Sequence, residues 1–195
     1  MSWEICSRCA FGISLIILSF GIVAAAEKRR HDPHVHGVAE INIAVEGSKA
    51  QLEFRAPAES VMGFEHEAKS ESDKKKRDAA LELLRSKTDQ LVLFDSKLGC
   101  KSSPMKTAIV EEKEERSKEQ AGKEKRAHKD QKKSGEHREV HGTYSVACDK
   151  PLAGSRVKFG VTKVFRDIQE IKVQVVGDSG QSGATIKKDK GDVKL

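Results

Sequence analysis

The stretch "VAEINIAVEGSKAQLEFRAP", residues 38–57, decides the fold because it alternates apolar and polar residues with the period of a β-strand. In its first half, four apolar side chains share one face: Ala39, Ile41, Ile43 and Val45. After the Gly-containing turn "EGSKA", Leu52 and Phe54 repeat the same period, and Pro57 ends the pattern. The stretch therefore predicts a β-hairpin with one buried face.

The rest of the chain adds one main helix and further strands. Capping residues from Ser70 onward, followed by Ala80 and Leu84 at helical spacing, predict a helix over about residues 70–90. Alternating patterns predict three more strands, and a Gly- and Lys-rich end predicts a terminal hairpin: residues 105–112, 137–148, 171–176 and 177–195. The expected fold class is α+β, with a mostly antiparallel sheet, hairpins and one main helix.

Charge is spread along the chain rather than gathered into a binding surface. The 195 residues carry a formal net charge of +6, and 34% of them are charged. Basic residues alternate with acidic ones and are not interleaved with aromatics, which argues against a nucleic-acid partner. Residues 111–136 are almost wholly charged and have few apolar side chains to bury, so we expect a mobile, disordered loop there.

The N-terminus predicts export. Arg8 precedes the apolar run "CAFGISLIILSFGIV", and the small residues "AAA" end at Ala26. This order is typical of a cleavable signal peptide over residues 1–26, leaving a single domain over residues 27–195 in the periplasm with no stable membrane insertion. The alternative is a retained anchor, although 15 residues are short for the roughly 20 that a bilayer requires.

Two cysteines remain after residue 26. In an oxidising compartment, Cys100 and Cys148 are expected to form a disulfide. Two buried free thiols are the alternative.

The histidines form groups with metal-ligand chemistry. His34 and His36 are two apart and share one face of an extended chain, and Glu65 with His66 follows the hairpin. A further group shares one face of a later strand: His137, Glu139 and His141. Imidazole and carboxylate groups bind Zn²⁺ and other divalent transition metals. The alternative is that these histidines belong to a solvated leader and an exposed strand face.

Several segments also resemble a known family. The segments "HVHGVAEINIAVEG", "APAESVMGFEHEA", "LFDSKLGC", "HREVHGTYSVAC", "VKFGVTKVF" and "GQSGATI" appear in the order and rough spacing of the ZrgA family of zinc-regulated periplasmic proteins. The resemblance implies zinc binding, an α+β fold, a disulfide at the two cysteine positions and a His-rich loop between the halves. By motif position, it implies ligands at His34, His36, His66 and His137. The loop departs from the family, because it holds only His128 among many Lys and Glu residues, so we expect few stoichiometric sites.

Three classes of function are compatible with these features. The leading hypothesis is a non-enzymatic periplasmic protein that buffers zinc or delivers it to an uptake system. A second class is a structural or interaction protein of the envelope, in which metal binding is incidental. The third is a zinc-dependent hydrolase with Glu65 as general base, but the chain has no HExxH motif and no nucleophile elbow.

Overall fold

A computed structural model describes residues 35–112, 137–178 and 180–195, all of which belong to one compact unit over residues 33–195. The predicted signal peptide, His34 and residues 113–136 of the predicted loop lie outside the described residues. None of the helices in the described part of the chain is long and apolar enough to span a membrane.

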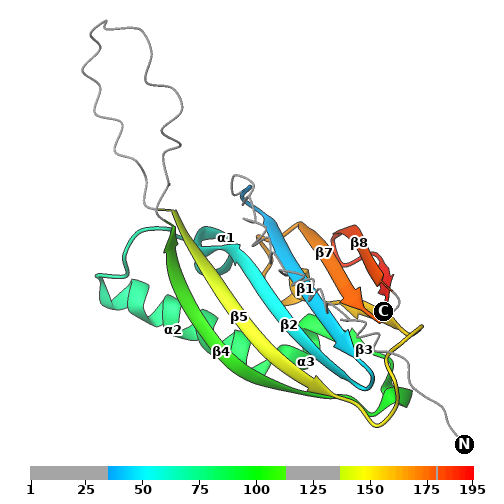
Figure 1. The fold of residues 1–195 in the computed structure, drawn as a ribbon. Helices are drawn as coiled ribbons and strands as arrows, with labels where there is room; N and C mark the ends of the chain where they lie inside the picture. Colours follow the sequence, from blue (N-terminus) through cyan, green and yellow to red (C-terminus); the bar gives the residue numbers. More distant parts are fainter. Residues whose placement is uncertain (1–34, 113–136, 179) are drawn as a thin grey trace, which may run out of the picture. The chain divides into compact units, whose positions relative to one another are not determined.

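The main sheet has six strands in the order β4-β5-β2-β1-β7-β8 (Figure 1). Its strands are β1 (Val38–Glu46), β2 (Lys49–Pro57), β4 (Lys101–Glu112), β5 (His137–Ala147), β7 (Glu170–Gly177) and β8 (Gly180–Lys187). All neighbours are antiparallel except β1 and β7, which run parallel. The predicted hairpin is confirmed, with Ile41 opposite Phe54 and Ile43 opposite Leu52.

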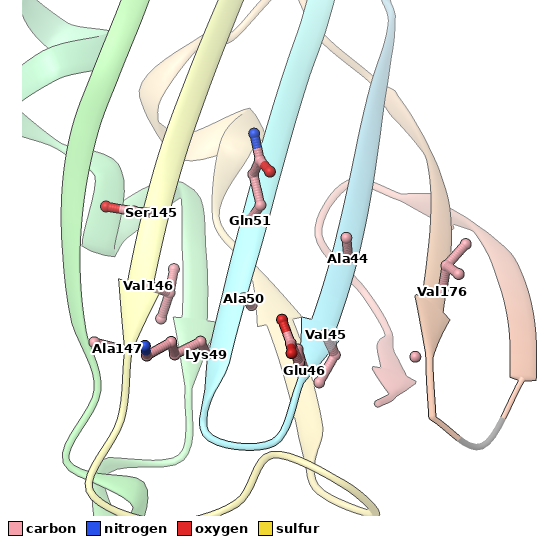
Figure 2. A pocket seen from close by; sticks show the side chains of 11 residues that line it. Ala44, Val45, Glu46, Lys49, Ala50, Gln51, Ser145, Val146, Ala147 and Val176 are labelled. Atoms are coloured by element: carbon pink, nitrogen blue, oxygen red, sulfur yellow. The ribbon is translucent and has the colours of Figure 1, made fainter.

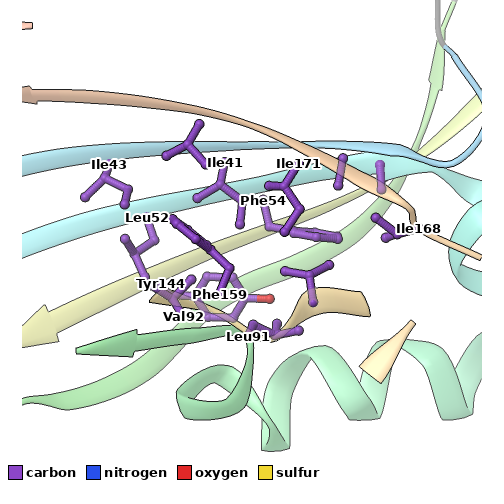
Figure 3. Packing of buried hydrophobic residues seen from close by; sticks show 14 of the residues in the cluster. Ile41, Ile43, Leu52, Phe54, Leu91, Val92, Tyr144, Phe159, Ile168 and Ile171 are labelled. Atoms are coloured by element: carbon purple, nitrogen blue, oxygen red, sulfur yellow. The ribbon is translucent and has the colours of Figure 1, made fainter. Parts of the chain in front are cut away.

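A small second sheet and short helices cover one face of the main sheet. The small sheet has the order β3-β6-β9, formed by β3 (Val92–Phe94), β6 (Arg156–Phe159) and β9 (Asp192–Lys194). The helices are α1 (Ala58–Met62), α2 (Glu71–Ser86), α3 (Thr88–Leu91) and α4 (Val161–Val164), with a 3-10 turn at Ser96–Leu98. Figure 3 shows Ile41 and Leu52 of the main sheet facing Leu91 and Phe159 of this layer.

The main helix is confirmed with a break near its end. The Ser70 side chain accepts a hydrogen bond from the Asp73 N–H at 3.0 Å, which caps α2 at the predicted start. Ala80 and Leu84 are buried, as the helical spacing predicts. The helix ends at Ser86, and α3 continues the predicted range as a separate turn. The predicted α+β class with a mostly antiparallel sheet is thus confirmed.

Two expectations were wrong in detail. The last segment forms no terminal hairpin: β8 pairs with β7, whereas β9 pairs with β6 in the other sheet. Each strand contributes one buried apolar residue to a different layer, since Ile186 lies opposite Ile171 and Val193 opposite Val157. The predicted loop over residues 111–136 is also wrong at its first two positions, because residues 111 and 112 are the last two of β4.

The predicted disulfide is confirmed between Cys100 and Cys148. Cys100 directly precedes β4 and Cys148 directly follows β5. In the register of these strands, Lys101 lies opposite Ala147 at this end, and His137 lies at the other. The covalent link therefore joins the two strands at the end of the sheet remote from His137.

The only tyrosine of the chain, Tyr144, lies in the hydrophobic core. Tyr144 is 2% exposed, and its hydroxyl has no hydrogen-bond partner within the described part of the chain. Gly142, two residues earlier, leaves room for the phenol, since a Cβ at Gly142 would collide with the Tyr144 hydroxyl. Burial raises the pKa of Tyr144 above its ordinary value of 10.0.

The burial of the Tyr144 phenol predicts that the folded protein loses stability at alkaline pH. The unfolded chain releases the phenol proton above about pH 10 and the folded protein does not, so stability falls as pH rises above that value. We expect Tyr144→Phe to remove this contribution and, at neutral pH, to leave the free energy of unfolding unchanged or raise it by up to about 1 kcal/mol. Urea denaturation of both proteins at neutral and alkaline pH measures the difference. A phenolate absorbance that titrates in the folded protein as it does in free tyrosine would contradict the prediction.

Candidate metal centre

The short helix α1 and the turn after it bring Glu59 and Glu65 to one surface. The chain leaves β2 at Pro57, and Glu59 lies in the first turn of α1. The helix ends at Met62 and is capped by Gly63, whose φ of 82° is left-handed and whose N–H donates to the Glu59 carbonyl oxygen at 2.7 Å. This reversal places Phe64 in the core at 8% exposure and leaves Glu65 at the surface beside it.

A partly buried hydrogen bond helps to set the position of His36. The Gly37 N–H donates to Ser60 Oγ at 2.9 Å, and Ser60 is a buried residue of α1. Gly37 has a left-handed φ of 78°, and a Cβ there would lie 3.2 Å from the Asp167 carbonyl oxygen. The glycine thus lets the chain before β1 pass close to Asp167, while its hydrogen bond to Ser60 ties the residue after His36 to α1, which carries Glu59.

Three side chains form a group of metal-ligand type. His36 Nδ1 lies 2.8 Å from Glu59 Oε2 and 3.7 Å from Glu65 Oε1, and one ligand atom from each residue lies within 4.8 Å of the others. A tetrahedral zinc ion with bonds of about 2.0–2.2 Å needs ligand atoms about 3.4 Å apart. Small rotations of exposed side chains reach that spacing, because His36 and Glu59 are 60% and 53% exposed.

His137 joins this group through the second oxygen of Glu65. The distance from His137 Nδ1 to Glu65 Oε2 is 3.5 Å, and Glu65 is 24% exposed. His137 is the first residue of β5, and the β2–β5 register places Glu139 opposite Pro57, where α1 begins. Glu65 therefore lies between imidazoles from the starts of two different strands.

Glu139 and His141 form a separate pair on the outer face of β5. His141 Nε2 lies 2.7 Å from Glu139 Oε2, and Glu139 is buried at 6% exposure although its strand face is turned away from the core. Its cross-strand neighbours are Pro57 of β2 and Val110 of β4. The pair is not part of the His36, Glu59 and Glu65 group.

His66 also lies outside that group. Its ring stacks on Phe64 with centroids 4.8 Å apart, and its Nδ1 lies 3.0 Å from the Glu67 carbonyl oxygen. When the Nδ1–H of an imidazole donates to a carbonyl oxygen, its Nε2 stays available to bind a metal. Among the described residues, however, His66 belongs to no group of three potential metal ligands.

The structure thus sorts the predicted site residues. It brings together His36, Glu65 and His137, it places His66 and the Glu139–His141 pair apart from them, and it does not describe His34. Sequence analysis missed Glu59. Its only signal was a carboxylate two residues after Pro57, at the point where the strand pattern stops.

A pocket of about 530 Å³ lies at the opposite end of the main sheet (Figure 2). It is lined around the β1–β2 turn by residues that include Ala44, Val176 and Ala147. β1 runs from Val38, beside the His36 group, to Glu46 in the pocket, a span of roughly 26 Å at about 3.3 Å per residue. The pocket is therefore separate from the candidate metal centre.

The fold and this centre define a class: an α+β sheet protein that gathers histidine and carboxylate side chains of metal-ligand type at the end of its main sheet where β1 and β5 begin and β2 ends. Residues 33–195 match a family described as ZrgA family zinc uptake protein. The chain belongs to this family, which confirms the resemblance seen in its sequence segments. A comparison with curated proteins gives no match.

Proposed function

We propose that the protein is a periplasmic zinc-binding protein that buffers zinc or delivers it to an uptake system. The observation that carries the proposal is the approach of His36, Glu59 and Glu65 to one another in a member of a zinc uptake family. In the proposed site these three residues are the main ligands, and His137 contributes beside Glu65. His34, His66, Glu139 and His141 remain additional candidates from the sequence.

The exposure of the centre suits a protein that must release its ion. Structural zinc sites are closed by four protein ligands, whereas this centre offers three side chains and two of them are more than half exposed. Remaining positions on a bound ion would be open to water or to a ligand from a partner. Two carboxylates beside one neutral imidazole also balance the double charge of the ion.

The donor chemistry is compatible with zinc and with other divalent transition metals. Among these metals we propose zinc, because the chain belongs to a zinc uptake family. Under this proposal the protein is not an enzyme, and its partners are the zinc ion and a periplasmic or inner-membrane uptake system. The proposed location is supported by the signal peptide that the sequence predicts over residues 1–26.

Calorimetric zinc titration of single histidine variants tests the proposal. We expect the unmodified protein to bind zinc at low stoichiometry and His36→Ala to weaken binding by about 100-fold, since it removes the only imidazole of the central group. His66→Ala is the matched comparison and is expected to cost much less. His34→Ala alone measures whether the residue before the described region contributes.

Two results would contradict this assignment. Binding that does not saturate in the unmodified protein would remove zinc binding as the function and favour a structural role in the envelope. A larger loss for His66→Ala than for His36→Ala would place the site elsewhere.

A further inference from the structure

The end of the main sheet that holds the candidate metal centre also carries a cluster of cations. Two segments supply them, residues 161–169 after β6 and residues 187–190, which start at the last residue of β8. Together they contain five Lys or Arg side chains against two carboxylates, a formal charge of +3. The exposed cations without an ion pair among the described residues form what we call the basic platform: Lys163, Arg166, Lys188 and Lys190.

Hydrogen bonds hold the two segments against each other. Asp189 Oδ2 accepts from the Thr162 N–H at 2.9 Å and from Thr162 Oγ1 at 2.6 Å. The Gln169 side chain donates to the Arg166 carbonyl oxygen at 2.7 Å, which closes the turn before β7. Thr162 thus engages one oxygen of the Asp189 carboxylate, the other oxygen is buried without a hydrogen-bond partner among the described residues, and the cations on both sides of Asp189 remain exposed.

The basic platform is connected to the metal centre by two backbone hydrogen bonds. The Lys188 N–H donates to the Gln169 carbonyl oxygen at 2.9 Å, and the Gln169 N–H donates to the Gly37 carbonyl oxygen at 2.8 Å. Gly37 directly follows His36. The acidic centre and the basic platform therefore lie on two sides of Gly37, at the same end of the sheet.

We propose that the basic platform is a docking surface for an acidic protein that exchanges zinc with the neighbouring centre, an inference that rests on the proposed function. Opposite charges steer association and orient the partner, which would bring its own ligands to an ion held at His36. Zinc loading adds two positive charges at the same end and strengthens the attraction. Val35, next to His36 and 57% exposed, adds an apolar contact of the kind found inside polar interface rims.

An acidic protein fits better than a membrane. The two platform segments expose no large hydrophobic side chain that would insert among lipids. A layer of lipid headgroups also offers no imidazole to receive the ion.

The experiment compares two variants of the purified protein for binding to a fluorescent polyglutamate peptide. One replaces Lys163, Arg166, Lys188 and Lys190 by Gln. The control removes the same number of positive charges at exposed sites elsewhere: Lys75, Lys76, Lys97 and Lys106. We expect the platform variant to weaken peptide binding by about 10-fold at low salt, and the control to change it by less than about threefold.

Equal losses in the two variants would overturn the proposal, because binding would then follow net charge alone. Binding to phosphatidylglycerol vesicles without binding to the peptide would overturn it in favour of a lipid surface. Zinc titration of the platform variant is expected to match that of the unmodified protein. Failure of the unmodified protein to bind zinc would reject the proposed function, whereas a normal zinc titration with no effect of the platform on peptide binding would reject only the docking surface.

Discussion

Replacing Glu65 by glutamine is expected to weaken zinc binding by about 100-fold, or roughly 2.7 kcal/mol. The two oxygens of Glu65 face different imidazoles, with Oε1 3.7 Å from His36 Nδ1 and Oε2 3.5 Å from His137 Nδ1. The amide of glutamine has nearly the same shape but carries no charge, and only one of its two terminal atoms accepts a metal bond. The loss therefore reports ligation rather than a change in packing. Calorimetric titration with zinc measures it.

Glu67→Gln is the matched control for this change. Glu67 lies two residues further on, is exposed and pairs with Lys69 at 3.3 Å, outside the candidate centre. We expect its zinc affinity to stay within about twofold of the unmodified protein, since an exposed ion pair contributes little. Equal affinities for the Glu65 and Glu67 variants would show that the His36 group is not the zinc site.

Removing the disulfide is expected to cost about 4 kcal/mol of unfolding free energy, because Cys100 and Cys148 are separated by 48 positions and the link restricts the unfolded chain. For a domain of this size, the melting temperature would fall by roughly 8–16 °C. Thermal denaturation of a Cys100→Ser/Cys148→Ser variant beside the oxidised protein measures the difference.

Zinc binding should survive this loss of stability. The disulfide lies at the end of β4 and β5 where Lys101 is opposite Ala147, whereas His137 starts β5 at the other end. Below its melting temperature the double variant is therefore expected to bind zinc with unchanged affinity. A reducing agent should lower the stability of the unmodified protein and leave the variant unaffected. A variant as stable as the oxidised protein would contradict the entropic account.

Part of the candidate centre could be predicted from residue types and part could not. His36 and Glu65 were recognisable because imidazole and carboxylate groups flank the first hairpin. Glu59 was not, since its position depends on α1, a five-residue helix that starts after Pro57 and has no repeating apolar pattern. The separation of His66 was equally hidden: one residue from Glu65, it turns to stack on Phe64.

The sequence by itself determined the local elements. Alternating apolar residues specify the β1–β2 hairpin, the Ser70 cap and the Ala80–Leu84 spacing specify α2, and the pair Cys100 and Cys148 specifies the disulfide. These features depend on contacts close in sequence or on residue chemistry, so a pattern of a few residues contains them.

Only the tertiary structure decided how the distant segments meet. β1 and β7 pair in parallel although more than 120 residues separate them, and β9 leaves β8 to join β6 in the second sheet. These pairings join segments far apart in the sequence and bury apolar residues such as Ile171 and Val193, and an alternating pattern within one strand does not say which other strand lies beside it. The parallel pairing starts at Val38 opposite Glu170. It therefore places the start of β1, next to the candidate metal centre, and the start of β7, next to the basic platform, at the same end of the sheet.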